Sequence, residues 1–210
     1  MSFLEQAGRK FARFTTNLVV RSPAAWKLLR GLTRLQFHRI APIWDRNRSP
    51  DAFAPLEAAL DSLDGSPRRV LDLGTGTGSA AFIVAQRFPE ADVTGVDLAD
   101  GMLAEARRKI PPELASRVRF EKGDAAELEY PAGVFDLLTL ANMIPFFDEL
   151  ARLVAPGGSI VFSFSGGAGT PIYVPPERLR DELSRRGFTD FAEFVAGAGT
   201  SLVARKANEA

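Results

Sequence analysis

The chain has 210 residues, of which 46% are hydrophobic and 25% are charged, a balance that suits one globular domain of ordinary size. It contains no cysteine, which excludes disulfide bonds, zinc–thiolate sites and thiol nucleophiles. Its single histidine, His38, excludes a metal centre built from several histidines. No stretch approaches the ~20 apolar residues of a membrane span, and no secretory signal precedes the first helix, so a cytoplasmic protein is expected.

The formal net charge is zero, but the charges are unevenly distributed along the chain. Residues 1–50 contain ten Lys or Arg and only two acids, so this segment carries +8 and the remainder carries −8. Such an asymmetry indicates that the two parts of the chain face different partners.

The first 66 residues are predicted to form helices and no strands. Apolar residues recur at helical spacing from Phe3 to Leu18. Ser22 and Pro23 are typical of a helix start, with Ser22 as the N-cap, and Pro42 ends or bends the helix that follows. A third helix is expected over residues 55–63. Residues 1–66 are therefore interpreted as an N-terminal helical cap.

From residue 68 onward, short apolar runs alternate with helical stretches. The pattern predicts strands at 70–73, 93–96, 118–121, 135–140, 160–164, 191–195 and 201–204, and helices at 79–88, 101–109, 146–154 and 176–186. This alternation predicts an α/β fold with a doubly wound, mostly parallel sheet over residues 67–210. The core and the cap together are expected to form one structural domain.

The most informative segment is the glycine-rich run that follows the first predicted strand, Asp72-Leu73-Gly74-Thr75-Gly76-Thr77-Gly78. A phosphate-binding loop of nucleotide hydrolases would need Lys-Ser or Lys-Thr after the last glycine, whereas Ser79-Ala80 stands there. A dinucleotide loop would need a third Gly or Ala where Ser79 stands. A turn without a ligand is the remaining alternative. Such a turn would not require three alternate glycines, which destabilise the start of the following helix.

This Asp-x-Gly-x-Gly-x-Gly pattern resembles motif I of the class I S-adenosylmethionine-dependent methyltransferases, and Asp72 stands where that family usually has an acid. Further motifs resemble the family in the expected order between residues 68 and 165. The resemblance implies a seven-stranded sheet of order 3-2-1-4-5-7-6 with the last strand antiparallel. It also implies S-adenosylmethionine as cofactor and S-adenosylhomocysteine as product.

Two acids after the second and third strands resemble the family's nucleoside-binding positions. Asp97 follows Val93-Thr94-Gly95-Val96 and, by the resemblance, accepts hydrogen bonds from the two ribose hydroxyls. Asp124 would accept the exocyclic amine of adenine. Read alone, Asp97 is equally consistent with a helix cap and Asp124 with a turn residue. The full cofactor-binding set expected from the resemblance is Trp44, Asp72, Gly74, Thr75, Gly76, Gly78, Asp97, Leu98, Met102, Asp124, Ala125 and Asn142.

The remaining motifs lie further along the chain and before the glycine loop. Asn142 ends the fourth strand, beside the expected position of the sulfonium, and residues 153–158 resemble the family's Leu-x-Pro-Gly-Gly turn before strand five. Trp44 and Asp45 resemble an aromatic–Asp pair of the ubiquinone/menaquinone-type methyltransferases, which points to that small-molecule branch. A core anchor is the alternative reading of Trp44.

Methyl transfer from a sulfonium needs positioning more than a catalytic dyad, because the cofactor supplies the reactivity. No general base is evident. His38 and Tyr173 are the candidates, each with a plain structural alternative as a packing or loop residue. No metal is expected, because the sequence offers Asn142 but not the Asp pair of the metal-dependent branch. A nucleic-acid substrate is not expected, because Asn142-Met143-Ile144-Pro145 departs from the motif of base-modifying enzymes.

The predicted function is metal-independent methyl transfer to a small-molecule or lipid- or quinone-like acceptor. A nicotinamide-dependent oxidoreductase and a non-catalytic S-adenosylmethionine-binding module are the alternatives. Three readings of the basic cap stay open: contact of residues 3–21 with an anionic membrane, RNA binding, and a lid whose arginines are solvated or paired with the acidic body. The sequence does not define an oligomeric state.

Overall fold

A computed structural model describes residues 3–46 and 48–208. Its helices are α1 (Phe3–Arg21), α2 (Trp26–Ile40), α3 (Ala54–Asp61), α4 (Ser79–Arg87), α5 (Asp100–Arg108), α6 (Phe147–Leu153) and α7 (Pro176–Ser184). Its strands are β1 (Arg69–Leu73), β2 (Asp92–Asp97), β3 (Val118–Lys122), β4 (Phe135–Ala141), β5 (Val154–Phe164), β6 (Phe188–Ala196) and β7 (Gly199–Lys206). Short 3-10 turns at 23–25, 41–43, 112–114 and 167–169 link these elements.

The seven strands form one sheet of order β3-β2-β1-β4-β5-β7-β6, which confirms the predicted fold class. The five strands from β3 to β5 pair in parallel, and β7 is antiparallel to both of its neighbours. Parallel strands covered on both faces need apolar side chains on both faces, and the burial pattern of β1 is accordingly continuous after its first residue.

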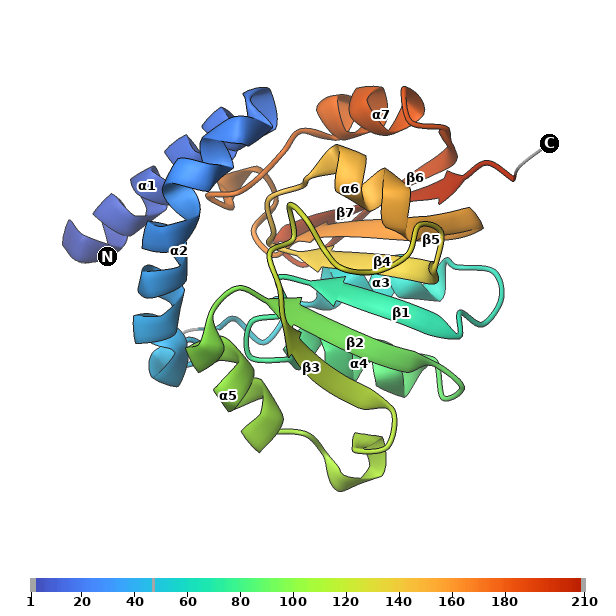
Figure 1. Ribbon diagram of the computed structural model, residues 1–210, viewed down its shortest axis with the longest axis horizontal. Coiled ribbons are helices and arrows are strands. Elements are labelled where there is room, and N and C mark those ends of the chain that lie inside the picture. The colour runs from blue at the N-terminus through green and yellow to red at the C-terminus, as the bar shows by residue number, and fades with distance from the viewer. Residues whose placement is uncertain (1–2, 47, 209–210) are drawn as a thin grey trace.

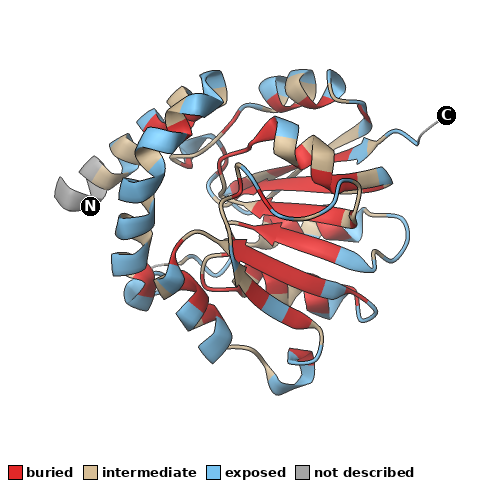
Figure 2. Cartoon of the chain, in the orientation of Figure 1, coloured by how far each residue is buried: buried red, intermediate tan, exposed pale blue. Residues whose placement is uncertain are grey.

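Helices cover the sheet on both sides, as Figure 1 shows. One face packs against α3, α4 and α5 through a core that includes Leu60, Val84 and Leu103. The other face packs against α6 and α7 through a core that includes Leu150 and Leu183. Figure 2 shows that buried residues follow the central strands along most of their length. The sheet is therefore a rigid platform whose strand ends can hold a site.

Two local features differ from the sequence prediction. Ser22 makes no side-chain capping hydrogen bond, because a 3-10 turn at 23–25 separates α1 from α2. β5 begins at Val154 rather than 160, since the strand pairs with β4 on both sides of a bulge. Inside that bulge Gly157 has φ +72, and a Cβ on Gly158 would lie 2.9 Å from the carbonyl oxygen of Asp136. Only glycine lets the chain stay paired there.

The helix α3, expected as part of the cap, packs on the sheet. Its Leu56, Ala59 and Leu60 are fully buried against strand residues such as Val161 and Val203. The helices outside the two layers are thus α1 and α2. The division at residue 66 stays a prediction about domain organisation.

From here on, the cap means residues 8–44 alone, which contain α2 and most of α1. In Figure 1 its helices stand beside the sheet at the side where β1 and β4 end. No helix within the described residues combines the length and the apolar character required to cross a membrane.

Candidate functional site

The glycine loop follows the carboxyl end of β1 and leads directly into α4. Gly74, Gly76 and Gly78 have φ values of +65, +56 and +86, a region that other residues rarely adopt. A Cβ on Gly78 would lie 2.7 Å from the ring of Phe120, and one on Gly74 would lie 2.5 Å from the sulfur of Met143. The three glycines are therefore required by backbone conformation, and two of them also by close packing.

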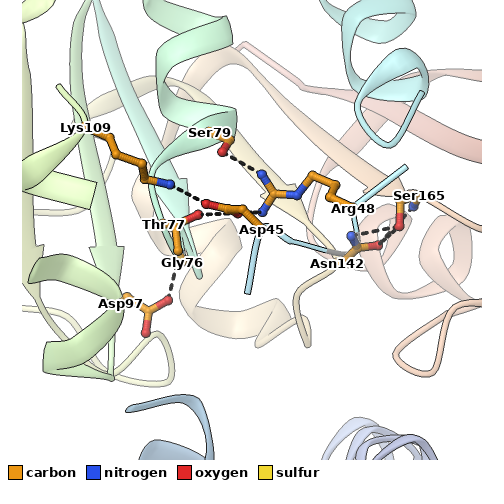
Figure 3. A network of polar contacts seen from close by, with 9 residues as sticks. All are labelled: Asp45, Arg48, Gly76, Thr77, Ser79, Asp97, Lys109, Asn142 and Ser165. Atoms are coloured by element: carbon orange, nitrogen blue, oxygen red, sulfur yellow. Dashed lines mark hydrogen bonds and ion pairs between the residues drawn. The ribbon is translucent and has the colours of Figure 1, made fainter. Parts of the chain in front are cut away.

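Asp97 lies at the carboxyl end of β2 and turns its carboxylate toward this loop, as seen in Figure 3. Its Oδ2 accepts the Gly76 N–H at 2.9 Å, and its Oδ1 accepts the Ala99 N–H at 2.8 Å. Burial raises the pKa of Asp97 above its ordinary value, although these backbone donors act in the opposite direction. Each oxygen retains a lone pair, which suits a ligand that presents two hydroxyl donors.

Asp72 lies beneath the loop and is almost fully buried. Its Oδ1 accepts a hydrogen bond from the Thr139 hydroxyl at 2.8 Å, whereas its Oδ2 has no partner. Burial raises the pKa of Asp72 to about 6, and the nearby charge of Asp97 adds to that rise. The hydroxyl of Thr75, within the loop itself, is also buried without a partner.

These features fit S-adenosylmethionine. The positive-φ glycines let the loop backbone approach a ligand with no side chain between, and Asp97 supplies a half-buried pair of acceptors for ribose hydroxyls. Asp72 adds a buried carboxylate oxygen with no partner, which suits a cationic ligand. The loop has no Lys-Ser or Lys-Thr pair after its last glycine to bind a phosphate. This agrees with the cofactor, whose methionine end carries no phosphate.

Asp124, expected to bind adenine, is held by the cap. Its Oδ1 accepts the indole N–H of Trp26 at 2.7 Å, and its Oδ2 pairs with the Arg30 guanidinium at 3.2 Å. The N–H of Ala126 also donates to Oδ1 at 3.1 Å. Trp26 is buried, and its ring lies edge-on to Phe146 at 5.3 Å between centroids. α2 is thus attached to the loops after β3 and β4.

Three other expected cofactor residues occupy packed positions. Ala125 is buried and Leu98 partly buried within the core that lies under α6 and α7. Met102 is fully buried in a small cluster with Ala41 and Ala99. Because Ala41 ends α2, Met102 contributes to the contact between the cap and α5.

His38, a candidate base, also serves that contact. Its Nδ1 accepts the N–H of Gly101 at 3.0 Å, at the start of α5. A Cβ on Gly101 would lie 2.7 Å from the carbonyl oxygen of His38. The two backbones therefore touch, and the structure places His38 in the docking of α2.

Trp44 and Asp45 connect the end of the cap to the glycine loop. The indole nitrogen of Trp44 would lie 3.8 Å from a Cβ on Gly76, and its ring lies edge-on to Phe37. Asp45 accepts the Thr77 hydroxyl at 2.9 Å and the Lys109 ammonium at 2.5 Å. Burial alone would raise the pKa of Asp45, but these donors and a neighbouring arginine lower it overall.

That arginine is Arg48, which the sequence interpretation did not single out. Figure 3 shows its guanidinium between Asp45 and Ser79. It pairs with Asp45 at 2.6 Å and donates to the Ser79 hydroxyl at 2.7 Å, at the first residue of α4. Burial lowers its pKa. A half-buried cation beside the glycine loop suits an anionic group of a ligand.

Asn142 follows β4 directly and has a left-handed backbone, with φ +54. Asn is one of the few residues other than glycine that tolerate this conformation. Its amide exchanges hydrogen bonds with Ser165 after β5, with the Ser165 N–H donating to Oδ1 at 3.0 Å. The following residue, Met143, places its thioether over Gly74. The site edge between β1 and β5 is therefore lined by a neutral amide, a hydroxyl and a thioether.

Tyr173, the second candidate base, lies beyond β5. Its ring packs edge-on against Phe164 at 5.1 Å. Burial, followed by the charges of Glu177 and Glu193, raises the pKa of its phenol. It borders a cavity of about 40 Å³ on the β6–β7 side of the sheet. Among the described residues, no hydrogen bond joins either candidate base to Asn142.

Comparison with known proteins agrees with this geometry. Residues 70–158 match the family model described as a methyltransferase domain. The chain is 42% identical over 137 residues to a demethylmenaquinone methyltransferase of Thermus thermophilus, covering 60% of this chain and 62% of the relative. It is 41% identical to the enzyme of the same name from Deinococcus radiodurans, covering 62% of this chain and 72% of the relative.

Solved structures share the fold. Phosphoethanolamine N-methyltransferase 2 of Haemonchus contortus, solved with S-adenosylhomocysteine, superposes with a TM-score of 0.60 at 20% identity, covering 75% of this chain and 53% of that one. The fold and the site together define a Rossmann-like, nucleoside-cofactor-binding protein. The chain belongs to the class I S-adenosylmethionine-dependent methyltransferases, and its family cofactor is S-adenosylmethionine.

Proposed function

We propose that the protein transfers the methyl group of S-adenosylmethionine to an apolar small molecule, of the quinol or lipid-like class. The observation that carries the proposal is the half-buried Asp97 carboxylate, which accepts the Gly76 N–H beside a loop of three positive-φ glycines. When bound, the cofactor supplies a methyl group already activated on a sulfonium. The chain spans about 62% of the Thermus relative's length, so the activity is a proposal for this chain.

The residues around the loop have distinct roles in this proposal. Asp97 holds the ribose, and the backbone of Gly74 and Gly76 lies against the methionine end. Arg48, which is paired with Asp45 and bonded to Ser79, is the cation beside the loop that would move from these partners to the carboxylate of that end. Trp44, 40% exposed, covers the loop from the cap side. Positioning of two reactants in line then accounts for most of the rate.

The proposed transfer uses neither a metal nor a dedicated base. The polar groups at the ends of β4 and β5 are neutral, namely Asn142, Ser163 and Ser165. His38 is bonded to Gly101 and the Tyr173 ring packs on Phe164, and within the described residues no hydrogen bond links either side chain to these groups. A quinol hydroxyl has a pKa of about 10 and is protonated at neutral pH, so the proton that the acceptor loses on methyl transfer would pass to solvent water.

The apolar acceptor is supported by the side chains near the loop. Met143 covers Gly74, and Ile43 and Trp44 are exposed beside it. Such side chains favour a hydrophobic ring over a sugar or a nucleotide. The names of the Thermus and Deinococcus relatives, both demethylmenaquinone methyltransferases, favour a quinol in particular. Such acceptors reside in lipid, so this acceptor class is compatible with peripheral contact of the basic cap with an anionic membrane, a contact that does not depend on it.

The cofactor is tested by calorimetric titration with S-adenosylmethionine, S-adenosylhomocysteine and NAD. We expect micromolar binding of both sulfur compounds and none of NAD. Asp97→Ala should weaken binding about 100-fold, since two hydrogen bonds to a charged group are lost. Asp92→Ala, at the exposed opposite end of β2, is the matched control. Selective binding of NAD would establish the oxidoreductase alternative instead.

The acceptor is tested by following S-adenosylhomocysteine formation. A demethylated quinol in detergent micelles is compared with a soluble dicarboxylic acid and with acceptor-free protein. Turnover with the quinol alone supports the proposal. Turnover with the acid alone would reject the apolar acceptor while retaining the methyltransferase. Tight cofactor binding without turnover on either acceptor would favour the non-catalytic module.

A further inference from the structure

The outer surface of the cap carries an apolar stripe with a cationic border. On α2, Leu28, Leu32 and Leu35 are 83%, 60% and 45% exposed. Their spacing of four and three residues puts them on one side of the helix. Trp26 and Arg30 contact the body through Asp124. Each lies two positions from a leucine of the stripe, which puts it on the opposite side of the helix. The leucines therefore face away from the site.

α1 repeats this division of faces. Arg9 and Arg13 donate to the carbonyl oxygens of Gly169 and Thr170 after β5, at 2.8 and 3.2 Å. Phe14, on the outer side, is 59% exposed. A Cβ on Gly8 would lie 3.8 Å from the side-chain nitrogen of Gln36, so α1 and α2 run side by side. Between them lies a groove of about 400 Å³, lined by Phe11, Leu32, Leu35, Gln36, Arg39 and Ile40.

The charges around this stripe have one sign. Residues 8–44 contain eight Lys or Arg and no Asp or Glu. Arg9, Arg13 and Arg30 are engaged with the body. The others are exposed and form no ion pair with any carboxylate of residues 8–46 and 48–208; they are Lys10, Arg21, Lys27, Arg34 and Arg39.

We infer that this outer surface, the α1–α2 seam, docks on an anionic phospholipid surface. Exposed Leu and Phe side chains can enter the boundary between headgroups and acyl chains, while the surrounding cations meet lipid phosphates. RNA would use the cations but would leave the leucines against water. A second copy of the chain would bring +8 segments together. Charge complementarity thus selects an anionic lipid as the occupant.

This inference differs from the sequence hypothesis in where the contact lies. The hypothesis named residues 3–21, but Arg9 and Arg13 of that segment face the body. The structure assigns the apolar part mainly to α2. The inference concerns a surface outside the cofactor site, so it stands or falls independently of the proposed acceptor.

The test is co-sedimentation of the full chain with vesicles of phosphatidylcholine alone or mixed with phosphatidylglycerol. We expect binding to the mixed vesicles only. The triple variant Leu28→Ser, Leu32→Ser, Leu35→Ser should lose it, whereas Val195→Ser, 80% exposed on β6, should not. Lys27→Glu with Arg34→Glu should lower binding at least ~10-fold, and Arg68→Glu with Arg69→Glu on the body should not.

Folding and the rival occupants are followed in the same samples. Every variant should bind S-adenosylmethionine like the parent protein in calorimetry, because the altered side chains are exposed and outside the site. Equal sedimentation with neutral and anionic vesicles would overturn the inference. So would a dimer in sedimentation velocity that the leucine variant abolishes, or binding to single-stranded RNA in place of vesicles.

Discussion

The body and the cap of this protein are held in place by different kinds of interaction. In the body, two continuous hydrophobic cores fix the sheet, with side chains such as Leu71, Leu138 and Phe162 fully buried. In the cap, only Thr15, Thr16, Val19, Trp26 and Ala41 are buried. The body is stabilised by apolar burial, whereas the cap depends on a small number of contacts at its inner faces.

Those cap contacts are mostly polar and directed at loops. Trp26 and Arg30 hold Asp124, and His38 accepts the Gly101 N–H; directly after the cap, Asp45 accepts the Thr77 hydroxyl. Each body residue in this set belongs to the loops or helix ends that surround the cofactor site. Under the proposed function the same loops serve cofactor binding and cap attachment, so that perturbing one is expected to affect the other.

The largest effect is expected in the body, from the buried Asp72. Its pKa is raised from 3.8 to about 6, so the folded protein binds more protons than the unfolded chain between about pH 4 and 6. The free energy of unfolding should thus fall as pH rises through this window, by about 3 kcal/mol. Urea denaturation of the parent protein and Asp72→Asn at pH 5 and 8 measures the upper part of this fall, about 1.4 kcal/mol, because the titration of the unfolded chain near pH 4 lies below this range.

In Asp72→Asn this component should be absent, so the variant should gain stability relative to the parent protein as pH increases. Asp92→Asn, an exposed acid on β2, is the control and should follow the parent curve. A parent protein whose unfolding free energy rises between pH 5 and 8 by as much as the variant's would contradict the assignment of a protonated, buried Asp72.

A second contrast comes from the same substitution in the two regions. A Cβ on Gly95 of β2 would lie 2.6 Å from both the Phe120 ring and the Thr75 hydroxyl, whereas one on Gly31 of α2 would meet no atom within 4 Å. We expect Gly95→Ala to cost about 2 kcal/mol of unfolding free energy through overpacking. Gly31→Ala should be neutral or stabilising by up to about 1 kcal/mol. Chemical denaturation distinguishes the two.

The body could be predicted from sequence because its signals are local and repeated. Each strand is a short apolar run, and each crossover helix has its own period, so element type and order follow from pattern. The glycine loop was recognisable because its backbone conformation admits few residues. The start of β5 was missed, since Pro156 and Gly157 read as a turn although the bulge stays paired.

Of the candidate site, only the residues that belong to the body could be predicted from sequence. Asp97 lies at the glycine loop as expected. No local pattern indicates that Trp26 and Arg30 hold Asp124, because those residues are 98 and 94 positions away from it. Arg48 had a weak signal, as a cation three residues after Asp45. Polar contacts between residues far apart in the chain leave no repeating pattern in the sequence, so they could not be predicted from it.

A third prediction concerns the shared carboxylate. Trp26→Phe keeps a ring against Phe146 but removes the donor to Asp124, so the cap should detach more readily while the body keeps its stability. We expect hydrogen exchange of α2 amides to accelerate about tenfold, which corresponds to one lost bond to a charged group. Asp124→Asn should also weaken cofactor binding, whereas Lys27→Gln on the outer face should change neither.

The smallest effect is expected to have opposite signs in the two regions. Gly101→Ala places a Cβ 2.7 Å from the carbonyl oxygen of His38, yet it improves the helix propensity of α5 by up to ~1 kcal/mol. The body should therefore unfold at the same or slightly higher urea concentration, while α2 amides exchange faster. If α2 exchange stays unchanged, the cap tolerates a shift at His38, and its position must depend on Trp26 and Asp45 instead.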